Sequence, residues 1–250
     1  MKKLLHALAM AFSMFCAVPC PFRIWDEAAR PLMTLCLPAV GALIGALWAL
    51  ALVVLRALAA PAVLCGAVLA VLPLALSGFM HMDGFLDVCD ALGSCRSVEE
   101  RRRILKDPHA GSFAVVSCAV YLLLFFGVCA SLRSETPAAA LLPIPIASRC
   151  CSSFFVSVLP AMSTSQYAGR FREGAGMIRL LVPVSILLAV SCAAFILWGR
   201  AGFAPVAVTA GYCLALRRGY RGLGGMNGDI AGYSLTIAEL CGAAALVLLG

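Results

Sequence analysis

A short stretch at residues 78–93, GFMHMDGFLDVCDALG, places one histidine and three aspartates close together in a very apolar chain. Asp83, Asp87 and Asp90 are spaced i, i+4 and i+7, so in a helix their carboxylates share one face. Three like charges at this spacing repel one another. A divalent cation removes that repulsion, and hard carboxylate oxygens suit Mg²⁺ or Mn²⁺. The stretch therefore predicts a carboxylate metal site, with His81 as general base or as donor to a phosphate.

A solvated acidic helix end, paired with Arg101–Arg103, is the alternative interpretation of these residues. It accounts for the charges but explains neither their one-face spacing nor the adjacent glycines. Asp87 and Asp90 are the stronger candidates for metal ligands, since Asp83 precedes Gly84 and can instead cap or orient.

Further along, the segment SVEERRRILKDPHAGSF offers Ser97 as the N-cap of a short basic helix, with Glu100 at the capping-box position. Lys106, Asp107 and His109 follow, just before the small residues that start the next apolar run. A cation, a carboxylate and an imidazole beside a helix start form a candidate phosphate site.

A second polar segment, RRGYRGLGGMNGDIAGYS at residues 217–234, contains six glycines together with Asn227 and Asp229. Glycines let backbone approach a ligand closely, and an aspartate that opens a helix can bind metal. Helix capping by Asn227 or Asp229 is the alternative.

Arg149 and Glu239 are ionisable residues inside apolar runs. Charges at such depth are candidates for function, and Arg149 is a candidate for binding phosphate. A structural ion pair between the two is the competing interpretation.

The composition of the whole chain defines the solvent in which these residues must work. Of the 250 residues, 63% are hydrophobic and only 12% are charged, and the mean hydropathy is +1.00. Soluble domains carry about 25% charged residues, and one soluble core could not hide this much apolar surface. The chain is therefore expected to be a polytopic, all-α membrane protein with a lipid bilayer as its main partner. Its formal charge of +7 fits positively charged cytoplasmic loops better than a nucleic-acid partner.

Two other features of the chain are given structural interpretations. The thirteen cysteines contain no CxxC pair, so we expect small apolar side chains rather than zinc ligands or a disulfide framework. The N-terminal sequence MKKLLHALAMAFSMFCAVPC looks like a signal peptide, but its cleavage site is poor. It is interpreted as a cytoplasmic-side or interfacial helix.

Seven apolar stretches are long enough to be considered as membrane spans, some of them marginally. They are residues 32–55, 59–80, 113–132, 137–159, 180–199, 202–216 and 232–250. Prolines inside them predict kinks. The sequence thus predicts one membrane-embedded domain over residues 1–250, with polar active-site segments at 81–112 and 217–230.

The nineteen lysines and arginines then predict the topology. Fifteen fall before the first span or in the loops after spans two, four and six, three fall in the intervening turns, and Arg149 lies within a span. The positive-inside rule places the N-terminus and all long polar loops in the cytoplasm. The three turns with one arginine each, and the C-terminus, are expected outside. The acidic stretch then lies on the cytoplasmic side with every other long polar segment.

The segments HMDGFLDVCDALG at 81–93, KDPHAGSF at 106–113 and GGMNGDIAGYSLTIAEL at 224–240, in this order, resemble the cobalamin synthase family, the adenosylcobinamide-GDP ribazoletransferases. The family hallmark H-x-D-G-x-x-D-x-x-D-[AG] is filled at every position. AVPCPF at 17–22 and LPAVGALIGA at 37–46 resemble its N-terminal pattern, so the resemblance covers nearly the whole chain. Two positions depart from the pattern: Pro108–His109 stand where Ser-Arg is commonest, and Tyr233 where a small residue is common.

The resemblance implies a multi-pass protein of the bacterial cytoplasmic (inner) membrane, with its active site facing the cytoplasm. It implies that α-ribazole, or its 5′-phosphate, attacks adenosylcobinamide-GDP, releasing GMP and forming adenosylcobalamin or its phosphate. Displacement at phosphorus needs charge neutralisation and positioning more than covalent catalysis, so Mg²⁺ is the expected cofactor. Association with other late enzymes of the pathway, or with a second copy of the chain, is left open.

The resemblance also implies roles for individual residues. The expected catalytic residues are His81, Asp83, Asp87 and Asp90. The expected metal ligands are Asp83, Asp87, Asp90 and Asp229. The expected substrate-binding residues are Lys106, Asp107, His109, Arg149, Asn227 and Asp229.

Two other functions are alternatives to this one. A membrane phosphotransferase of the CDP-alcohol type also uses clustered aspartates, but its D-G-x-x-A-R pattern is absent, since Asp87 follows Phe85–Leu86 here. A transporter should concentrate polar groups within the bilayer and often shows inverted repeats; no such repeat is visible.

Overall fold

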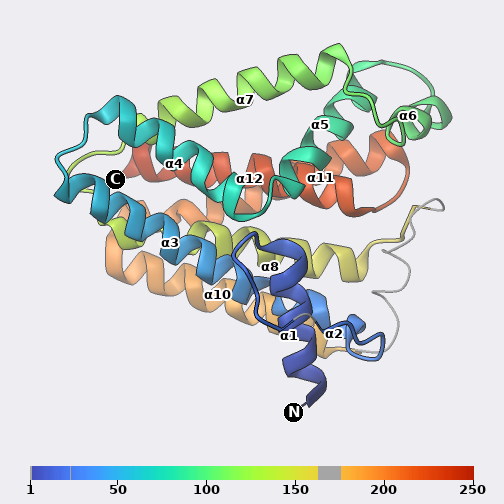
Figure 1. Cartoon of the computed structure of the whole chain (residues 1–250), viewed down its shortest axis with the longest axis horizontal. Helices are drawn as coiled ribbons and strands as arrows, with labels where there is room; N and C mark the ends of the chain where they lie inside the picture. The colour runs from blue at the N-terminus through green and yellow to red at the C-terminus, as the bar shows by residue number, and fades with distance from the viewer. Residues whose placement is uncertain (1, 23, 163–175) are drawn as a thin grey trace.

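The computed structural model describes residues 2–22, 24–162 and 176–250, and within these ranges the chain is helical, with no β-strand. Long helices run back and forth between two ends of the molecule (Figure 1). In order, the elements are α1 (Lys2–Phe15), α2 (Arg30–Met33), η1 (Thr34–Cys36), α3 (Leu37–Ala57), α4 (Ala62–Leu76), α5 (Met80–Gly93), α6 (Val98–Ile104), α7 (Ser112–Ala130), η2 (Ala138–Leu141), α8 (Pro143–Val158), α10 (Ile178–Trp198), η3 (Gly199–Phe203), α11 (Ala204–Leu223) and α12 (Gly228–Leu249). The predicted all-α class is confirmed.

Five helical stretches of the described chain are long and apolar enough to cross a membrane, or six if a bent pair counts as one span. The five are Arg30–Ala57, Ser112–Ala130, Ala138–Val158, Ile178–Leu223 and Gly228–Leu249. The predicted number of seven is not confirmed. Two of the predicted spans, 180–199 and 202–216, fall in the single stretch Ile178–Leu223, which η3 divides into α10 and α11.

The predicted span at 59–80 is shorter than expected, because helix α4 ends at Leu76. α4 and α5 meet at an angle of 93°. Gly78 and Phe79 make the turn with φ of +63° and +57°, a left-handed conformation that is costly for a phenylalanine. The acidic residues therefore lie on a helix, as expected, but that helix does not continue the second span.

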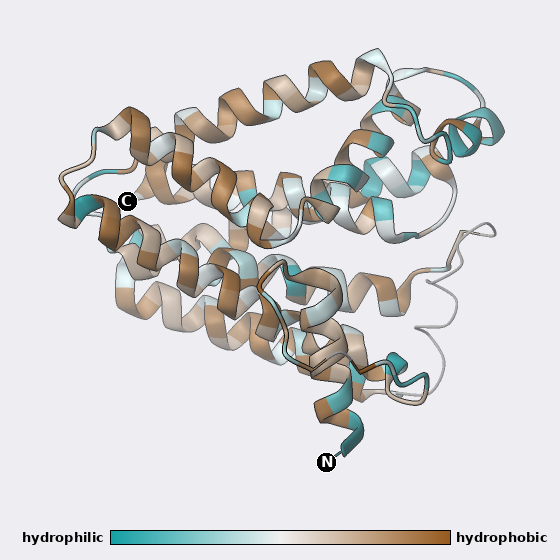
Figure 2. Ribbon diagram, in the orientation of Figure 1, coloured by the Kyte–Doolittle hydropathy of each residue, from teal (hydrophilic) through white to brown (hydrophobic). Residues whose placement is uncertain are grey.

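The apolar side chains that do not face the core form the outer surface of the bundle. Val115, Val116 and Leu123 on α7, and Leu188 and Ile196 on α10, are each more than 60% exposed. Such continuous apolar faces would be unfavourable in water and suit lipid. Figure 2 shows that the long helices of the bundle are mostly hydrophobic, and that hydrophilic residues gather around α5, α6 and the end of α11.

The three turns that carry one arginine each can be located in the structure. Arg56 donates to the carbonyl oxygens of Thr136 (2.7 Å) and Arg133 (2.6 Å), and Arg133 donates to that of Gly250 (2.6 Å). A surface hollow beside them is lined by Arg133, Arg200 and Gly250. The three turns with one arginine each thus share one end with the C-terminus. Arg23, Arg170 and Arg172, which the charge count assigned to the other end, lie outside the described residues.

The core that positions the polar end is built around α5, α7 and α12. Phe85 of α5 stacks on Tyr233 of α12, with ring centroids 5.8 Å apart, and contacts Tyr121 of α7 at 5.3 Å. Tyr121 in turn packs on Phe125, and Phe125 on Trp48 of α3. This aromatic chain holds α5 firmly between two membrane helices.

Helix α1 is a 14-residue amphipathic element that buries Ala7, Met10 and Ala11. It packs against α2, η1 and α3, and His6 Nδ1 lies 2.8 Å from the Asp26 carboxylate in the loop that follows. At about 1.5 Å per residue it is too short to cross a bilayer. This agrees with the interpretation of the N-terminus as an interfacial helix.

Candidate active site

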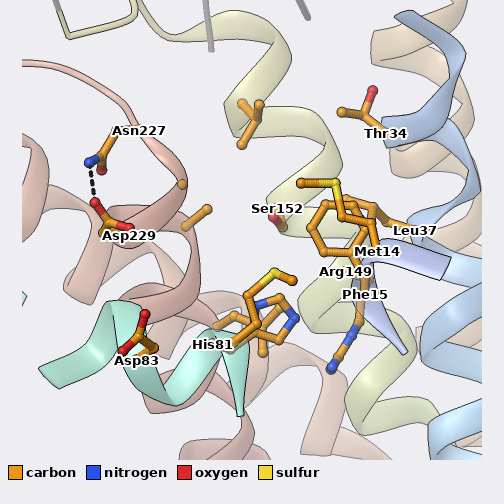
Figure 3. Close-up of a pocket in the computed structure, with 15 residues that line it drawn as sticks. Met14, Phe15, Thr34, Leu37, His81, Asp83, Arg149, Ser152, Asn227 and Asp229 are labelled. Atoms are coloured by element: carbon orange, nitrogen blue, oxygen red, sulfur yellow. Dashed lines mark hydrogen bonds between the residues drawn. The ribbon is translucent and has the colours of Figure 1, made fainter. Parts of the chain in front are cut away.

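A pocket of about 190 Å³ opens where five parts of the chain meet: α1, η1 with the start of α3, α5, α8 and the start of α12. Its polar lining consists of Thr34, His81, Asp83, Arg149, Ser152, Asn227 and Asp229. Its apolar lining includes Met14, Phe15, Leu37, Met80, Val156 and Leu235. Figure 3 shows Asp83, Asn227 and Asp229 on one side, Met14, Phe15 and Leu37 on the other, and His81 between them. The fold therefore brings the acidic stretch at residues 78–93 together with the polar segment at residues 217–234.

Close packing of α5 on α12 brings these two segments together. The backbone of Gly84 lies against that of Asp229, and the backbone of His81 lies against Gly232. Thr236 donates a hydrogen bond to the carbonyl oxygen of His81 (3.2 Å). Small residues let two membrane helices approach closely. As a result, two segments about 145 positions apart in the sequence face one pocket.

Asn227 forms the N-cap of α12, as one interpretation of the sequence expected. Its side-chain oxygen accepts from Ile230 N (2.9 Å), and its amide donates to Asp229 Oδ2 (2.6 Å). The preceding residue is fixed as well, because Met226 N donates to Pro160 O (2.9 Å) and Met226 O accepts from Met162 N (2.8 Å). The cap thus holds the Asp229 carboxylate beside the pocket and does not exclude a role in binding.

The carboxylates gather around Asp87, which is partly buried. It experiences repulsion from Asp83, Asp229 and Asp90. Asp90 also accepts a hydrogen bond from Ala114 N (3.4 Å) in the first turn of α7, so it lies at the far side of the cluster. Crowded carboxylates of this kind are stabilised by a divalent cation.

No three His, Cys, Asp or Glu side chains within the described ranges lie close enough to form a complete metal cage. Mg²⁺ usually takes only one or two carboxylates and fills its other positions with water and substrate phosphate. One or two of the carboxylates of Asp83, Asp87 and Asp229 would be enough for an ion held in that way. All thirteen cysteines are free thiols.

Arg149 and Glu239 form the buried ion pair that the sequence left as an alternative. Ser148 donates to the same carboxylate (2.9 Å) and accepts from Arg149 (3.1 Å). Both charged side chains are almost fully buried, but Arg149 Nε and Nη2 have no hydrogen-bond partner among the described residues. Arg149 also lines the pocket, so it keeps two free donors beside its structural role.

Lys106, Asp107 and His109 lie outside this pocket, exposed in the loop between α6 and α7. The His109 backbone N–H donates to Asp107 Oδ1 (3.0 Å), and the imidazole Nδ1 lies 2.8 Å from the same oxygen. The backbone hydrogen bond and then the ring lower the pKa of the Asp107 carboxyl. The structure thus shows a local Asp107–His109 pair where the sequence suggested a phosphate site.

Helix α6 has a structural task that the sequence only partly revealed. Ser97 accepts from Glu100 N (3.3 Å), which confirms the predicted N-cap. Arg102 donates to the carbonyl oxygens of Leu223 (2.7 Å) and Gly224 (2.8 Å), and Arg101 to that of Gly222 (3.2 Å). These bonds satisfy the last carbonyl groups of α11 and fix the segment that leads to Asn227.

The sequence interpretation missed the pocket wall from the N-terminal third of the chain. Met14 and Phe15 close α1, Thr34 lies in η1 and Leu37 opens α3, and Ser152 on α8 was missed too. These residues carry no charge and form no spaced motif. Their only signals were the resemblance of the neighbouring segment 17–22 to a family pattern and that of segment 37–46, which begins at Leu37.

Comparison with known proteins gives a consistent picture. Residues 7–247 match the family model described as cobalamin-5-phosphate synthase. A Clostridium perfringens (strain 13 / Type A) protein named adenosylcobinamide-GDP ribazoletransferase is 38% identical over 253 residues, covering 100% of this chain and 99% of the relative. Proteins of the same name from Clostridium botulinum (strain Alaska E43 / Type E3) and Geobacillus kaustophilus (strain HTA426) are 34% and 30% identical, covering 97% and 93% of this chain and 97% and 91% of their own lengths. No solved structure matches.

Proposed function

The chain belongs to the cobalamin-5-phosphate synthase family, and we propose that the pocket between α5 and α12 is where it works as an adenosylcobinamide-GDP ribazoletransferase. The observation that carries the placement is the meeting of His81 and Asp83 with Asn227 and Asp229. The activity is the late nucleotide-loop step of cobalamin synthesis. No feature of the described chain favours a CDP-alcohol phosphotransferase or a transporter over it.

In this reaction a ribose hydroxyl of α-ribazole, or of its 5′-phosphate, attacks the phosphorus that joins cobinamide to GMP. A phosphorus–oxygen bond to the ribose forms, the bond to GMP breaks, and the hydroxyl proton must be accepted. His81 lies between the two sides of the pocket, and we assign it as the base that accepts this proton. Asn227 then orients Asp229 through its amide.

We propose that Mg²⁺ is held by one or two of the carboxylates of Asp83, Asp87 and Asp229. Asp90, also on α5, lies behind them next to the start of α7. A bound Mg²⁺ would neutralise charge on the pyrophosphate and on the departing GMP. The chain's own part is to hold these carboxylates near one another although their negative charges repel. Arg149 offers its two free donors to a phosphate oxygen. Lys106, Asp107 and His109 stay candidates for contacting the outer part of a large substrate.

We further propose that the polar end faces the cytoplasm of a bacterial inner membrane. Most arginines and lysines fall before the first predicted span or in the loops after spans two, four and six, which is the pattern of cytoplasmic segments. Both substrates are large polar molecules, and the pocket lies at this end.

The test uses the full chain in lipid nanodiscs with adenosylcobinamide-GDP, α-ribazole and Mg²⁺, and measures GMP by chromatography. We expect GMP and a corrinoid product to form in equal amounts, and EDTA to stop both, with recovery on adding Mg²⁺. GMP release without the corrinoid product would point to a hydrolase instead. Turnover that is insensitive to EDTA would contradict the metal proposal but not the transferase.

A further inference from the structure

The side of the pocket opposite the carboxylates is apolar, and most of its residues lie outside the motifs of the sequence. Met14 and Phe15 come from α1, Leu37 from α3, Val156 from α8 and Leu235 from α12. Phe15 and His81 present nearly parallel rings, with centroids 6.3 Å apart and an interplanar angle of 13°. In Figure 3 this side is separated from Asp83 and Asp229 by His81. An apolar wall beside a carboxylate cluster needs a ligand part that is itself apolar.

Two buried polar groups show that the ligand there is not purely hydrocarbon. Thr34 lines the pocket and is 3% exposed, yet its hydroxyl has no hydrogen-bond partner in the described part of the chain. Arg149 Nη2 is likewise buried without a partner. Buried polar groups in proteins are nearly always hydrogen-bonded. The Arg149 guanidinium can bind the phosphate part of a substrate, as proposed above. The free Thr34 hydroxyl beside an apolar wall suits a heteroaromatic ring with a polar atom at its edge better than a lipid chain.

The size of the pocket restricts the ligand further. An engineered apolar cavity of about 150 Å³ holds one benzene molecule. At about 190 Å³ this pocket has room for one flat ring system and part of the group attached to it. The corrinoid macrocycle, with its four linked pyrrole-type rings, is far too large for it. Flat rings of this size are present in both substrates, as the base of α-ribazole and as the guanine and adenine of adenosylcobinamide-GDP. The base of α-ribazole carries fewer polar groups than either purine, so it suits the apolar lining best.

We infer that the apolar half of the pocket binds the aromatic base of α-ribazole, and that Phe15 on α1 determines which bases fit. The inference rests on the proposed function, since it assigns one substrate to one half of the same pocket. The base extends the Phe15–His81 stack, as bases do on aromatic side chains. Thr34 hydrogen-bonds the ring edge. The ribose then lies toward His81 and the carboxylates, where its hydroxyl must react.

The test measures binding of each substrate separately, so it does not depend on turnover. Dissociation constants for α-ribazole and for adenosylcobinamide-GDP are measured by equilibrium dialysis on the protein in nanodiscs. For Phe15→Ala we expect about a tenfold weaker binding of α-ribazole, the size of a lost stacking contact, and adenosylcobinamide-GDP within twofold. Thr34→Val, which keeps the side-chain shape, should weaken only α-ribazole, about fivefold.

Leu5→Ala is the matched control, because Leu5 lies on the same helix, is 64% exposed and does not line the pocket. It should change neither constant. If Phe15→Ala lowers the amount of folded protein, Phe15→Leu is used in its place, because it keeps the side-chain bulk but removes the ring stack. The α-ribazole affinity of Phe15→Leu then tests the inference. Loss of adenosylcobinamide-GDP binding with α-ribazole unaffected would overturn the assignment.

The outcomes for the pocket and for the reaction are distinguishable. If all three pocket variants bind α-ribazole as tightly as the unaltered chain, the pocket takes something else, such as a lipid tail, even though GMP is still released. If the unaltered chain binds α-ribazole in this pocket but never releases GMP, the binding inference stands and the proposed reaction fails.

Discussion

Gly84 on α5 packs directly against the backbone of Asp229 on α12: a Cβ at position 84 would lie 2.8 Å from the Asp229 Cα and 2.9 Å from its carbonyl oxygen. Two polar segments that are distant in the sequence thus touch at one glycine. The contact sets how far the α5 carboxylates stand from Asp229. If the distance between α5 and α12 grows at this point by less than 1 Å, the pocket residues on the two helices should also move apart. Tightly packed helix backbones transmit such a displacement because they cannot bend away from each other locally.

Gly84→Ala is therefore expected to lower GMP release about 100-fold, the cost of displacing reacting groups by about 1 Å. The added methyl group meets backbone atoms, so the helices must separate, at about 1–3 kcal/mol of stability. Gly127→Ala on α7 is the control, since a Cβ there has no atom within 4 Å. It should keep full activity and gain about 0.5–1 kcal/mol. Equal losses in both variants would mean that α5 and α12 are not coupled in this way.

Asp87→Asn should abolish turnover while the protein still inserts and folds. The substitution removes one charge from a group that Asp83, Asp229 and Asp90 repel, so the metal-free protein should be at least as stable as the original. Thermal unfolding in detergent, with and without Mg²⁺, measures this. The stabilisation by Mg²⁺ should shrink in the variant. Glu99→Gln, an exposed carboxylate on α6, should leave activity and the Mg²⁺ effect unchanged. A parallel loss of folding and activity in Asp87→Asn would instead indicate a structural role for the cluster.

The buried Arg149–Glu239 pair allows structure and binding to be separated. Arg149→Met alone leaves the Glu239 carboxylate buried without its partner, which should cost about 3–5 kcal/mol. The double variant Arg149→Met/Glu239→Gln removes both charges and should recover most of that stability. Because Arg149 also lines the pocket with free donors, the double variant should still be at least about 30-fold less active. Full activity in a stable double variant would show that Arg149 serves only the fold.

The sequence was enough to predict the helix that carries the acidic residues, since their spacing of i, i+4 and i+7 repeats with the helix period. Its direction was not predictable. The 93° turn before it depends on left-handed conformations at Gly78 and Phe79, and a phenylalanine gives no sign that it will adopt one. Residues 59–80 are apolar enough for a span, and hydropathy alone does not show where a helix breaks.

The site was predictable to the extent that its residues are charged. Asn227 and Asp229 stood out among glycines, and the alternative interpretations of Asn227 as a cap and Arg149 as an ion-pair partner were confirmed. The apolar wall of Met14, Phe15 and Leu37 was not predictable. In a chain that is apolar throughout, an apolar residue that lines a pocket does not differ from one that faces the core or the lipid. Lys106 and His109 looked like pocket residues because of their type, but the α6–α7 loop leaves them exposed.

The contact of Arg102 with the end of α11 gives a last prediction, about positioning at a distance from the pocket. Its guanidinium donates to the carbonyl oxygens of Leu223 and Gly224 at the same time. One ammonium group cannot reproduce this geometry. Arg102→Lys should therefore cost about 1–2 kcal/mol of stability. It should also let the segment before Asn227 move, lowering kcat about tenfold with little change in substrate affinity. Hydrogen exchange of residues 223–230 measures the movement directly. Arg103→Lys, at the exposed neighbouring position, is the control and should alter neither exchange nor kcat. Unchanged exchange at 223–230 in Arg102→Lys would show that the cap on α11 does not hold the Asn227–Asp229 pair in place.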